Sequence, residues 1–254
     1  MSTVDNALSQ LSAVIITKNA ADTIARTLNS LERFDEVVIY DNGSSDGTLE
    51  IVRGYPNVSL HQGEFLGFGP SKNHAVSLAR HDWVFSIDAD EVLPAALLEE
   101  LAGLALDEAR QAFFVNRTNL FMDKPVHHSG WGGDWLLRLF HRQVHRFTDA
   151  MVHEHVATHA ETRQIKLKNA MLHYAVTDVA QFLNKINRYS EIRKENAKKS
   201  YPLPVILLKA KWAFFRTYVL RRGFMDGWRG LVIAVSNANG VFYKNIKIYA
   251  AKKQ

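Results

Sequence analysis

Short apolar runs alternate with stretches of helical spacing through the first half of the chain. β-branched and aliphatic runs predict buried strands over residues 12–17, 36–40, 57–61 and 83–87. Apolar residues that recur every three or four positions predict helices over residues 20–31, 48–53, 70–80 and 94–106. Because strands separated by helices pair in parallel through right-handed crossovers, this half predicts an open, mostly parallel α/β sheet.

The pattern changes in the middle of the chain and again near its end. Apolar runs without intervening helices predict strands of a smaller mixed sheet over residues 111–117, 135–142, 151–158 and 165–173. Helical spacing follows over residues 178–199, 204–222 and 224–250, with breaks at Pro202 and Gly223. We therefore predict a body over residues 1–176, with halves at about 1–110 and 111–176, and a helical C-terminal region over 177–254.

Composition and charge narrow the class of protein. The chain has 254 residues, of which 47% are hydrophobic and 22% charged, and this is typical of a globular domain with an appendage. It has no cysteine, which excludes disulfides, thiolate metal sites and a cysteine nucleophile. No apolar run is long enough to span a bilayer, and the first ten residues show no secretory signal.

Basic residues are concentrated at the C-terminal end. Residues 185–254 hold 16 Lys and Arg against 3 Asp and Glu, whereas residues 1–184 hold 15 against 23. A basic segment of this kind favours an anionic partner such as lipid headgroups, nucleic acid or phosphate. The simpler alternative is a solvated helical face, or a face that packs on the body or on a second subunit.

Polar residues follow three of the predicted strands at the points where the strands end. These clusters are Thr17-Lys18-Asn19, Asp41 to Asp46, and Asp88-Ala89-Asp90. Ligands of open α/β sheets bind beyond the carboxyl ends of the strands, so the clusters predict a shared site. The carboxylates of Asp88 and Asp90 can supply oxygen ligands to a divalent cation whose shell is completed by phosphate. The alternative is an exposed turn in which Glu91 and Pro94 begin the next helix.

Two further motifs leave alternatives open. Gly67-Phe68-Gly69 partly matches a dinucleotide-binding fingerprint, but Lys72 stands where the third glycine belongs, so an NAD-dependent oxidoreductase is a weaker hypothesis. In an extended strand, Glu154 shares a face with two valines while His153 and His155 share the other. Glu154 could therefore serve as a base, or the two histidines could bind zinc.

The sequences VIITKNAADTIARTLNSL, VVIYDNGSSDGT and VFSIDADE resemble the nucleotide-sugar half of family 2 glycosyltransferases of GT-A fold. Further segments extend the resemblance to the branch that contains lipopolysaccharide inner-core glucosyltransferases: WLLRLFHR, MVHEHV, LHYAV and FLNKINRYSEIRKENA. The resemblance implies an inverting transfer of glucose from a UDP-sugar to a hydroxyl of a lipid-linked glycan, the heptose of the inner core. It implies a Mg²⁺ or Mn²⁺ cofactor, a peripheral position on the inner face of the cytoplasmic membrane and no nucleic-acid partner, and it leaves a homo-oligomer open.

The resemblance also implies roles for individual residues. Nucleotide-sugar binding falls to Thr17, Asp41, Asp46, Lys72, Asp88, Lys185 and Tyr189. Metal binding falls to Asp88 and Asp90, the acids of a DxD motif, and to His173. Glu154 matches the carboxylate that removes the proton of the acceptor hydroxyl, while Trp131 and Arg138 are candidates for acceptor contact. A cation and nearby basic groups would stabilise the charge that builds on the leaving phosphate, and single displacement needs one base and no covalent nucleophile.

The basic C-terminal region has the composition of an interfacial helix. Its cations include Lys209, Lys211, Arg216, Arg221, Arg222 and Arg229. They are interleaved with Ile206, Leu207, Trp212, Phe214, Phe215, Tyr218 and Trp228. This pattern predicts a contact with an anionic membrane surface, and DNA or RNA binding through the same region is the competing hypothesis.

Overall fold

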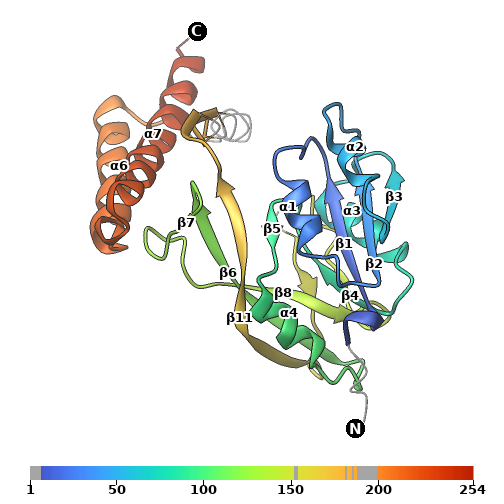
Figure 1. The fold of residues 1–254 in the computed structure, drawn as a ribbon. Helices are drawn as coiled ribbons and strands as arrows, with labels where there is room; N and C mark the ends of the chain where they lie inside the picture. Colours follow the sequence, from blue (N-terminus) through green and yellow to red (C-terminus); the bar gives the residue numbers. More distant parts are fainter. Residues whose placement is uncertain (1–6, 152–153, 181, 185, 188–198, 254) are drawn as a thin grey trace. The chain divides into compact units, whose positions relative to one another are not determined.

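A computed structural model describes residues 7–151, 154–180, 182–184, 186–187 and 199–253 of the chain (Figure 1). The described residues fall into two compact units. The first comprises residues 1–117 and 134–173, and the second comprises residues 118–133 and 174–254. Segment 118–133 therefore belongs to the same unit as the C-terminal helices.

Four parallel strands form the first half of the sheet, as the sequence predicts. They are β1 (Leu11–Thr17), β2 (Glu36–Asp41), β3 (Val58–Gln62) and β4 (Trp83–Ser86). Their order is β3-β2-β1-β4, and the register pairs Thr17 with Asp41 and Val14 with Ser86. Because all four run in the same direction, the polar residues that follow them gather at one edge of the sheet.

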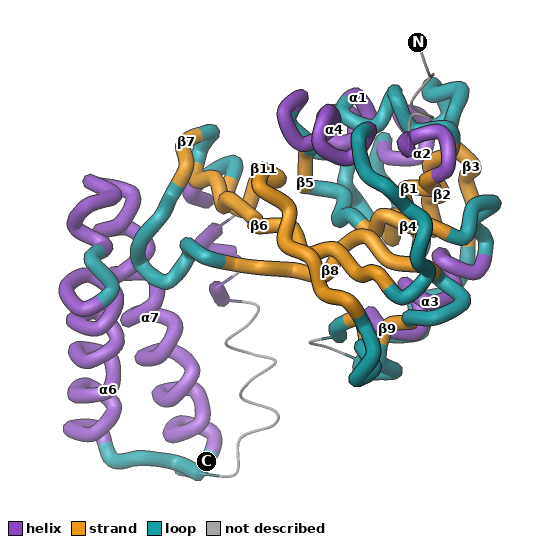
Figure 2. The backbone as a smooth tube through the Cα atoms, turned by 90° about the horizontal axis from the view of Figure 1, so that it is seen from below, coloured by secondary structure: helices purple, strands orange, loops and turns teal. Residues whose placement is uncertain are grey.

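The remaining strands extend the same sheet beyond β4, to which the next strand pairs in the antiparallel direction (Figure 2). The order continues from β4 through β8 (Asp134–His141), β6 (Gln111–Phe121), β11 (Arg163–Val176) and β5 (Glu91–Val92). A short strand, β7 (Lys124–Pro125), pairs with β6, which makes nine strands in all. The strands that were predicted to form a smaller mixed sheet thus join the parallel strands in one sheet. A separate two-stranded sheet consists of β9 (Arg146–Phe147) and β10 (Val156–Ala157).

Helices cover both faces of the parallel strands. Residues of α1 (Ile24–Asn29), α2 (Thr48–Val52) and α4 (Ala95–Ala102) share one core cluster with Ala13 and Ile15 of β1. Residues of α3 (Phe68–Ser77) share the other cluster with Val14 of the same strand. Because successive strand residues point to opposite faces, the apolar run of β1 serves both layers. A short 3₁₀ helix, η1 (Ala7–Gln10), precedes β1.

The second unit contains a pair of C-terminal helices. Helix α6 (Leu203–Phe215) continues into a π-helical turn, η2 (Arg216–Leu220). After Arg222, whose φ is 53°, a 3₁₀ turn, η3 (Gly223–Asp226), leads into α7 (Gly227–Ala251). The break predicted at Gly223 therefore occurs there. Within the described residues, no helix combines the length and the apolar character needed to cross a membrane.

The prediction of a strand over 151–158 is wrong for most of its described part. Strand β10 covers only Val156–Ala157, and residues 152–153 lie outside the described part of the chain. The physical reason is a competing backbone partner, because the carbonyls of Ala150 and Met151 accept hydrogen bonds from Gly69 and Phe68 at the start of α3. Most of the helix predicted over 178–199 lies outside the described residues.

Candidate active site

Thr17 and Asp41 lie side by side at the ends of β1 and β2. The Asp41 carboxylate is fully buried and accepts hydrogen bonds from the backbone N–H of Gly43 at 3.0 Å and of Ser44 at 2.9 Å, and from the Ser44 hydroxyl. Gly43 has a φ of 86°, a conformation that glycine adopts without strain. The Thr17 hydroxyl oxygen is buried and has no hydrogen-bond partner among the described residues. A buried orphan oxygen beside a rigid turn is a suitable contact for a bound ligand.

Asp46 fastens the turn after β2 to its neighbours. Its carboxylate accepts the backbone N–H of Ala21 at 3.2 Å and both the N–H and the hydroxyl of Thr48, at 3.1 and 2.5 Å. The Thr48 hydroxyl holds the pKa of Asp46 below its usual value. In the same region Asn19 and Ser44–Ser45 exchange hydrogen bonds of 2.8 Å. The contacts of Asp46 that the structure shows are therefore those of a residue that shapes the rim.

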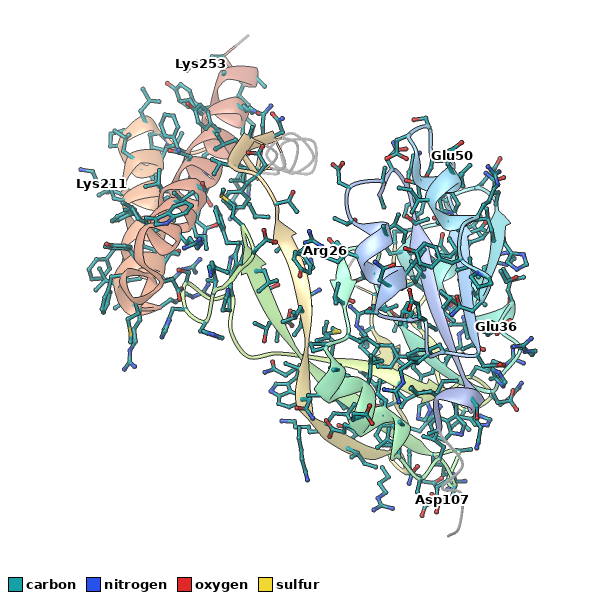
Figure 3. The ribbon with its side chains drawn as sticks, in the orientation of Figure 1. Arg26, Glu36, Glu50, Asp107, Lys211 and Lys253 are labelled. Atoms are coloured by element: carbon teal, nitrogen blue, oxygen red, sulfur yellow. The ribbon has the colours of Figure 1, made fainter. Side chains whose placement is uncertain are left out.

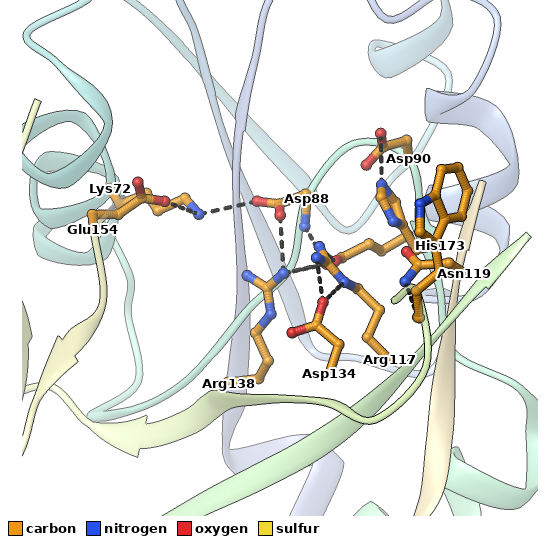
Figure 4. A network of polar contacts seen from close by, with 11 residues as sticks. Lys72, Asp88, Asp90, Arg117, Asn119, Asp134, Arg138, Glu154 and His173 are labelled. Carbon is orange, nitrogen blue, oxygen red and sulfur yellow. Dashed lines mark hydrogen bonds and ion pairs between the residues drawn. The ribbon is translucent and has the colours of Figure 1, made fainter. Parts of the chain in front are cut away.

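Glu91, which is fully buried, holds the Asp88-Ala89-Asp90 turn in place. The Glu91 carboxylate accepts the backbone N–H of Asp88 at 2.9 Å, and the Glu91 N–H returns a 3.0 Å bond to the Asp88 carbonyl. The Arg138 guanidinium lies 2.6 Å from Glu91 and 2.9 Å from the Asp88 carboxylate (Figure 4). Arg117 joins Glu91, at 3.1 Å, to Asp134, at 2.6 Å. Two arginines and one buried acid thus fix the backbone that carries Asp88 and Asp90.

Electrostatics keep Asp88 ionised. Burial alone would raise the pKa of Asp88, but the Arg138 guanidinium and the Lys72 ammonium hold it well below its usual range. Burial alone would lower the pKa of Arg138, and the carboxylates of Asp88 and Glu91 raise it instead. The Asp88 side chain is 34% exposed, so a charged carboxylate at the sheet edge remains accessible to a ligand.

Lys72 joins the two sides of the site. Its ammonium lies 3.1 Å from the Asp88 carboxylate and 2.8 Å from that of Glu154, and the lysine is 7% exposed (Figure 4). Glu154 lies just before β10, with its side chain 14% exposed. The contact brings a carboxylate from the second half of the chain to the edge formed by the parallel strands.

Helix α3, which carries Lys72, is fixed to the segment that precedes Glu154. Asn73 exchanges two hydrogen bonds with the backbone of Phe147, at 2.8 and 2.9 Å. Gly69 comes so close to the Thr148 carbonyl that a Cβ at this position would lie 1.9 Å from that oxygen. The Gly67-Phe68-Gly69 sequence is thus explained by the close approach of two backbones, without a dinucleotide.

Asp90 and His173 form a second pair of site residues, with 3.3 Å between the carboxylate and the ring Nε2. The antiparallel pairing of β5 with β11 aligns His173 with Glu91, which explains how residues so distant in sequence meet. No cluster of three metal-ligating side chains occurs within the described part of the chain. The partly exposed Asp90 carboxylate nevertheless suits a hard divalent cation whose other ligands come from phosphate, and the neutral imidazole of His173 is a common type of metal ligand.

The structure joins Lys72 to Asp88 and Glu154, and Asp90 to His173, whereas the roles of Trp131 and Arg138 stay predictions. Arg138 contacts Asp88 and Glu91 and is 4% exposed, so the contacts it shows are to the turn, and its acceptor contact stays a prediction. Trp131 belongs to the second unit, where its ring packs against Phe121 and Phe182. Lys185 and Tyr189 lie outside the described residues, as does His153 of the zinc hypothesis.

The sequence reasoning missed Glu91, Arg117 and Asp134. The alternative interpretation placed Glu91 in an exposed turn at the start of a helix, but Glu91 lies on a short strand and its carboxylate is buried. The available signal was its position between the acidic turn and the apolar Val92-Leu93, because an acid flanked in this way is unusual unless it is paired.

Several known proteins are similar to this chain in sequence or in fold. The family model described as "Glycosyl transferase family 2" matches residues 12–170. An uncharacterized glycosyltransferase of Rickettsia prowazekii is 28% identical over 95% of this chain and 87% of its own length. The lipopolysaccharide core biosynthesis glycosyltransferase LpsC of Rhizobium meliloti is 27% identical over 94% of this chain and 92% of its own. Among solved structures, S. aureus TarS 1–349 in complex with UDP is 16% identical with a TM-score of 0.45, over 96% of this chain and 91% of that one.

Proposed function

The chain belongs to glycosyl transferase family 2 and is a glycosyltransferase, and from this premise we propose that it transfers glucose from UDP-glucose, with inversion, to a lipid-linked glycan. The acceptor in this proposal is a hydroxyl of the heptose of the lipopolysaccharide inner core. The name of the relative LpsC supports the acceptor class. A lipid-linked acceptor also supports a peripheral position at the inner face of the cytoplasmic membrane.

The observation that carries the proposal is the contact of Lys72 with both Asp88 and Glu154. A sugar transferase needs positive charge beside the leaving phosphate and a carboxylate beside the attacking hydroxyl. The Lys72 ammonium and the Glu154 carboxylate supply these two groups within 2.8 Å of each other.

We assign the nucleotide to the ends of the parallel strands. Thr17 and Asp41 hold the uracil base, supported by the orphan Thr17 hydroxyl, and Asp46 shapes the turn beside them. Asp88 binds the ribose, and Lys72 binds the diphosphate. Lys185 and Tyr189 close over the diphosphate in this proposal.

Asp90 and His173 would hold a Mg²⁺ or Mn²⁺ ion, with Asp88 nearby. When bound, the ion neutralises charge on the diphosphate. The acceptor hydroxyl attacks the anomeric carbon as its proton passes to Glu154, and the bond from that carbon to the phosphate oxygen breaks with its electron pair. The charge on the leaving oxygen is met by Lys72, and Trp131 and Arg138 remain proposed contacts for the acceptor.

The direct test is donor consumption by the purified protein. A set of UDP-sugars with Mg²⁺ is incubated with and without an inner-core lipid acceptor, and UDP release is measured. We expect release from UDP-glucose that depends on the acceptor, and its loss in Glu154→Gln. Acceptor-dependent release with full rate in Glu154→Gln would contradict the assignment of the base.

A further inference from the structure

The C-terminal helix pair exposes an unusual amount of apolar surface. Of the twenty large hydrophobic residues that are exposed in the described part of the chain, thirteen lie between Leu203 and Tyr243. Leu208, Trp212, Phe215 and Val219 follow one another at intervals of four, three and four residues, so they form one stripe along α6 and η2. Leu208 is 65% exposed and Trp212 is 55% exposed, and exposed patches of this kind mark an interaction site.

The turn between the helices continues the apolar surface. Leu220, Phe224, Met225 and Trp228 are 57, 52, 57 and 49% exposed. Leu220 is the last residue of η2, Phe224 and Met225 lie in η3, and Trp228 lies in the first turn of α7. Aromatic, aliphatic and thioether side chains thus reach solvent together at one end of the helix pair.

The charge on this region is positive with almost no exception. Residues 199–253 contain eleven Lys and Arg and a single acid, Asp226. The Asp226 carboxylate is 6% exposed because it accepts the backbone N–H groups of His127 and His128 and pairs with the His128 ring at 3.0 Å. Lys211 projects from α6, and Lys253 lies near the end of α7 (Figure 3). The charge presented to solvent is therefore cationic.

These features select one partner. A second copy of the chain would bring the same cationic face against itself in a two-fold contact, and like charges would oppose it. Nucleic acid would meet the cations and aromatic rings but would leave the exposed leucines, valine and methionine without a partner. An anionic bilayer accommodates both the apolar side chains and the cations, because the apolar side chains enter the boundary of the acyl chains while Lys and Arg contact the headgroups.

We propose that the surface formed by α6, η2, η3 and the first three turns of α7 docks on an anionic phospholipid bilayer without crossing it. This surface would place the enzyme at the membrane that carries its lipid-linked acceptor, and only this biological role rests on the proposed function. Trp212 and the turn residues Leu220, Phe224 and Met225 enter the bilayer. Lys209, Lys211 and Arg216 lie at the level of the headgroups.

The test is sedimentation of the full chain with vesicles of phosphatidylcholine, alone or mixed with phosphatidylglycerol. We expect binding to the mixed vesicles only, weakened by high salt. Lys209→Gln combined with Lys211→Gln should weaken binding about 30-fold, at about fivefold for each near-surface cation. Trp212→Ala should weaken it as well.

The first unit offers matched controls. Trp135 is also exposed, and Lys166 lies 4.8 Å from its ring much as Lys209 lies 4.2 Å from the Tyr201 ring. Lys166→Gln combined with Lys168→Gln, and Trp135→Ala, should leave vesicle binding unchanged. UDP release with a soluble acceptor should be unchanged in Trp212→Ala, which separates this proposal from the transfer reaction.

Three results would overturn the proposal. Equal binding to both kinds of vesicle would remove the requirement for anionic lipid. Absence of vesicle binding together with a dimer that Trp212→Ala dissociates would assign the surface to a second copy. Absence of vesicle binding together with salt-dependent binding of a single-stranded oligonucleotide would assign it to nucleic acid.

Discussion

Replacing Lys72 by methionine removes the ammonium group that lies between Asp88 and Glu154. Methionine fills much of the same volume, so the principal change is loss of a charge that lies 3.1 and 2.8 Å from two carboxylates. The lysine is 7% exposed and the Glu154 side chain 14%, so water can replace the lost partner only in part.

The expected size of the effect follows from these contacts. Removing one partner of a buried ion pair costs about 3–5 kcal/mol of folding free energy. Asp88 keeps Arg138 at 2.9 Å and is one-third exposed, so we expect the lower end, about 3 kcal/mol. Glu154→Gln in the same chain removes the unpaired charge, and the double variant should recover about 1–2 kcal/mol.

Urea unfolding of the wild type, both single variants and the double variant measures this coupling, and steady-state UDP release measures the catalytic part. Turnover of Lys72→Met should fall by about 100-fold or more, because the cation faces the leaving phosphate. Lys72→Arg, which keeps the charge, should restore part of both quantities. The reasoning would be refuted if the changes in unfolding free energy of the two substitutions added within about 0.5 kcal/mol and the turnover of Lys72→Met stayed near that of the wild type.

Three further predictions test the support around the site. Glu91→Gln should destabilise the fold by about 3 kcal/mol and weaken UDP binding, because Arg117 and Arg138 lose a buried partner; urea unfolding and calorimetry check this, with Asp134→Asn as the milder control. The pKa of Asp88 is lower in the folded protein than its ordinary value of 3.8, so the ionised carboxylate stabilises the fold fully above about pH 3.8. This stabilisation is lost as the pH falls from there through the folded-state pKa. Unfolding free energies measured at acidic pH should therefore fall less steeply in Asp88→Asn than in wild type. Gly69→Ala places a Cβ 1.9 Å from the Thr148 carbonyl and should lower the thermal midpoint, whereas Gly133→Ala, with open space at the Cβ position but a positive φ, should lower it less.

The sequence was sufficient to predict that Thr17, Asp41 and Asp88 lie at one edge of the sheet, because these residues follow local patterns. Thr17, Asp41 and Asp88 each end an apolar run or follow it directly, and parallel pairing brings such ends to one edge. The parallel half of the fold follows from the same alternation of strands and helices.

The support beneath the site could not be predicted, because it depends on pairing between distant strands. Glu91 meets Arg117 from 26 residues away and Arg138 from 47 residues away, and only the order of β8, β6, β11 and β5 brings them together. Periodicity gives no information on this order. Likewise, the segment before Glu154 bonds to the start of α3 instead of to a strand, a long-range choice that overrides its local β-propensity.

The most direct test of the central claim is calorimetric titration with UDP, with and without Mn²⁺, of the wild type, Asp90→Asn and Glu154→Gln. We expect UDP to bind the wild type more tightly with Mn²⁺, Asp90→Asn to lose this gain, and Glu154→Gln to keep the gain while losing turnover. Binding of NAD in place of UDP would contradict the claim that the ends of the parallel strands hold a nucleoside diphosphate and its cation. A gain in UDP affinity with Mn²⁺ that survives Asp90→Asn would contradict it as well.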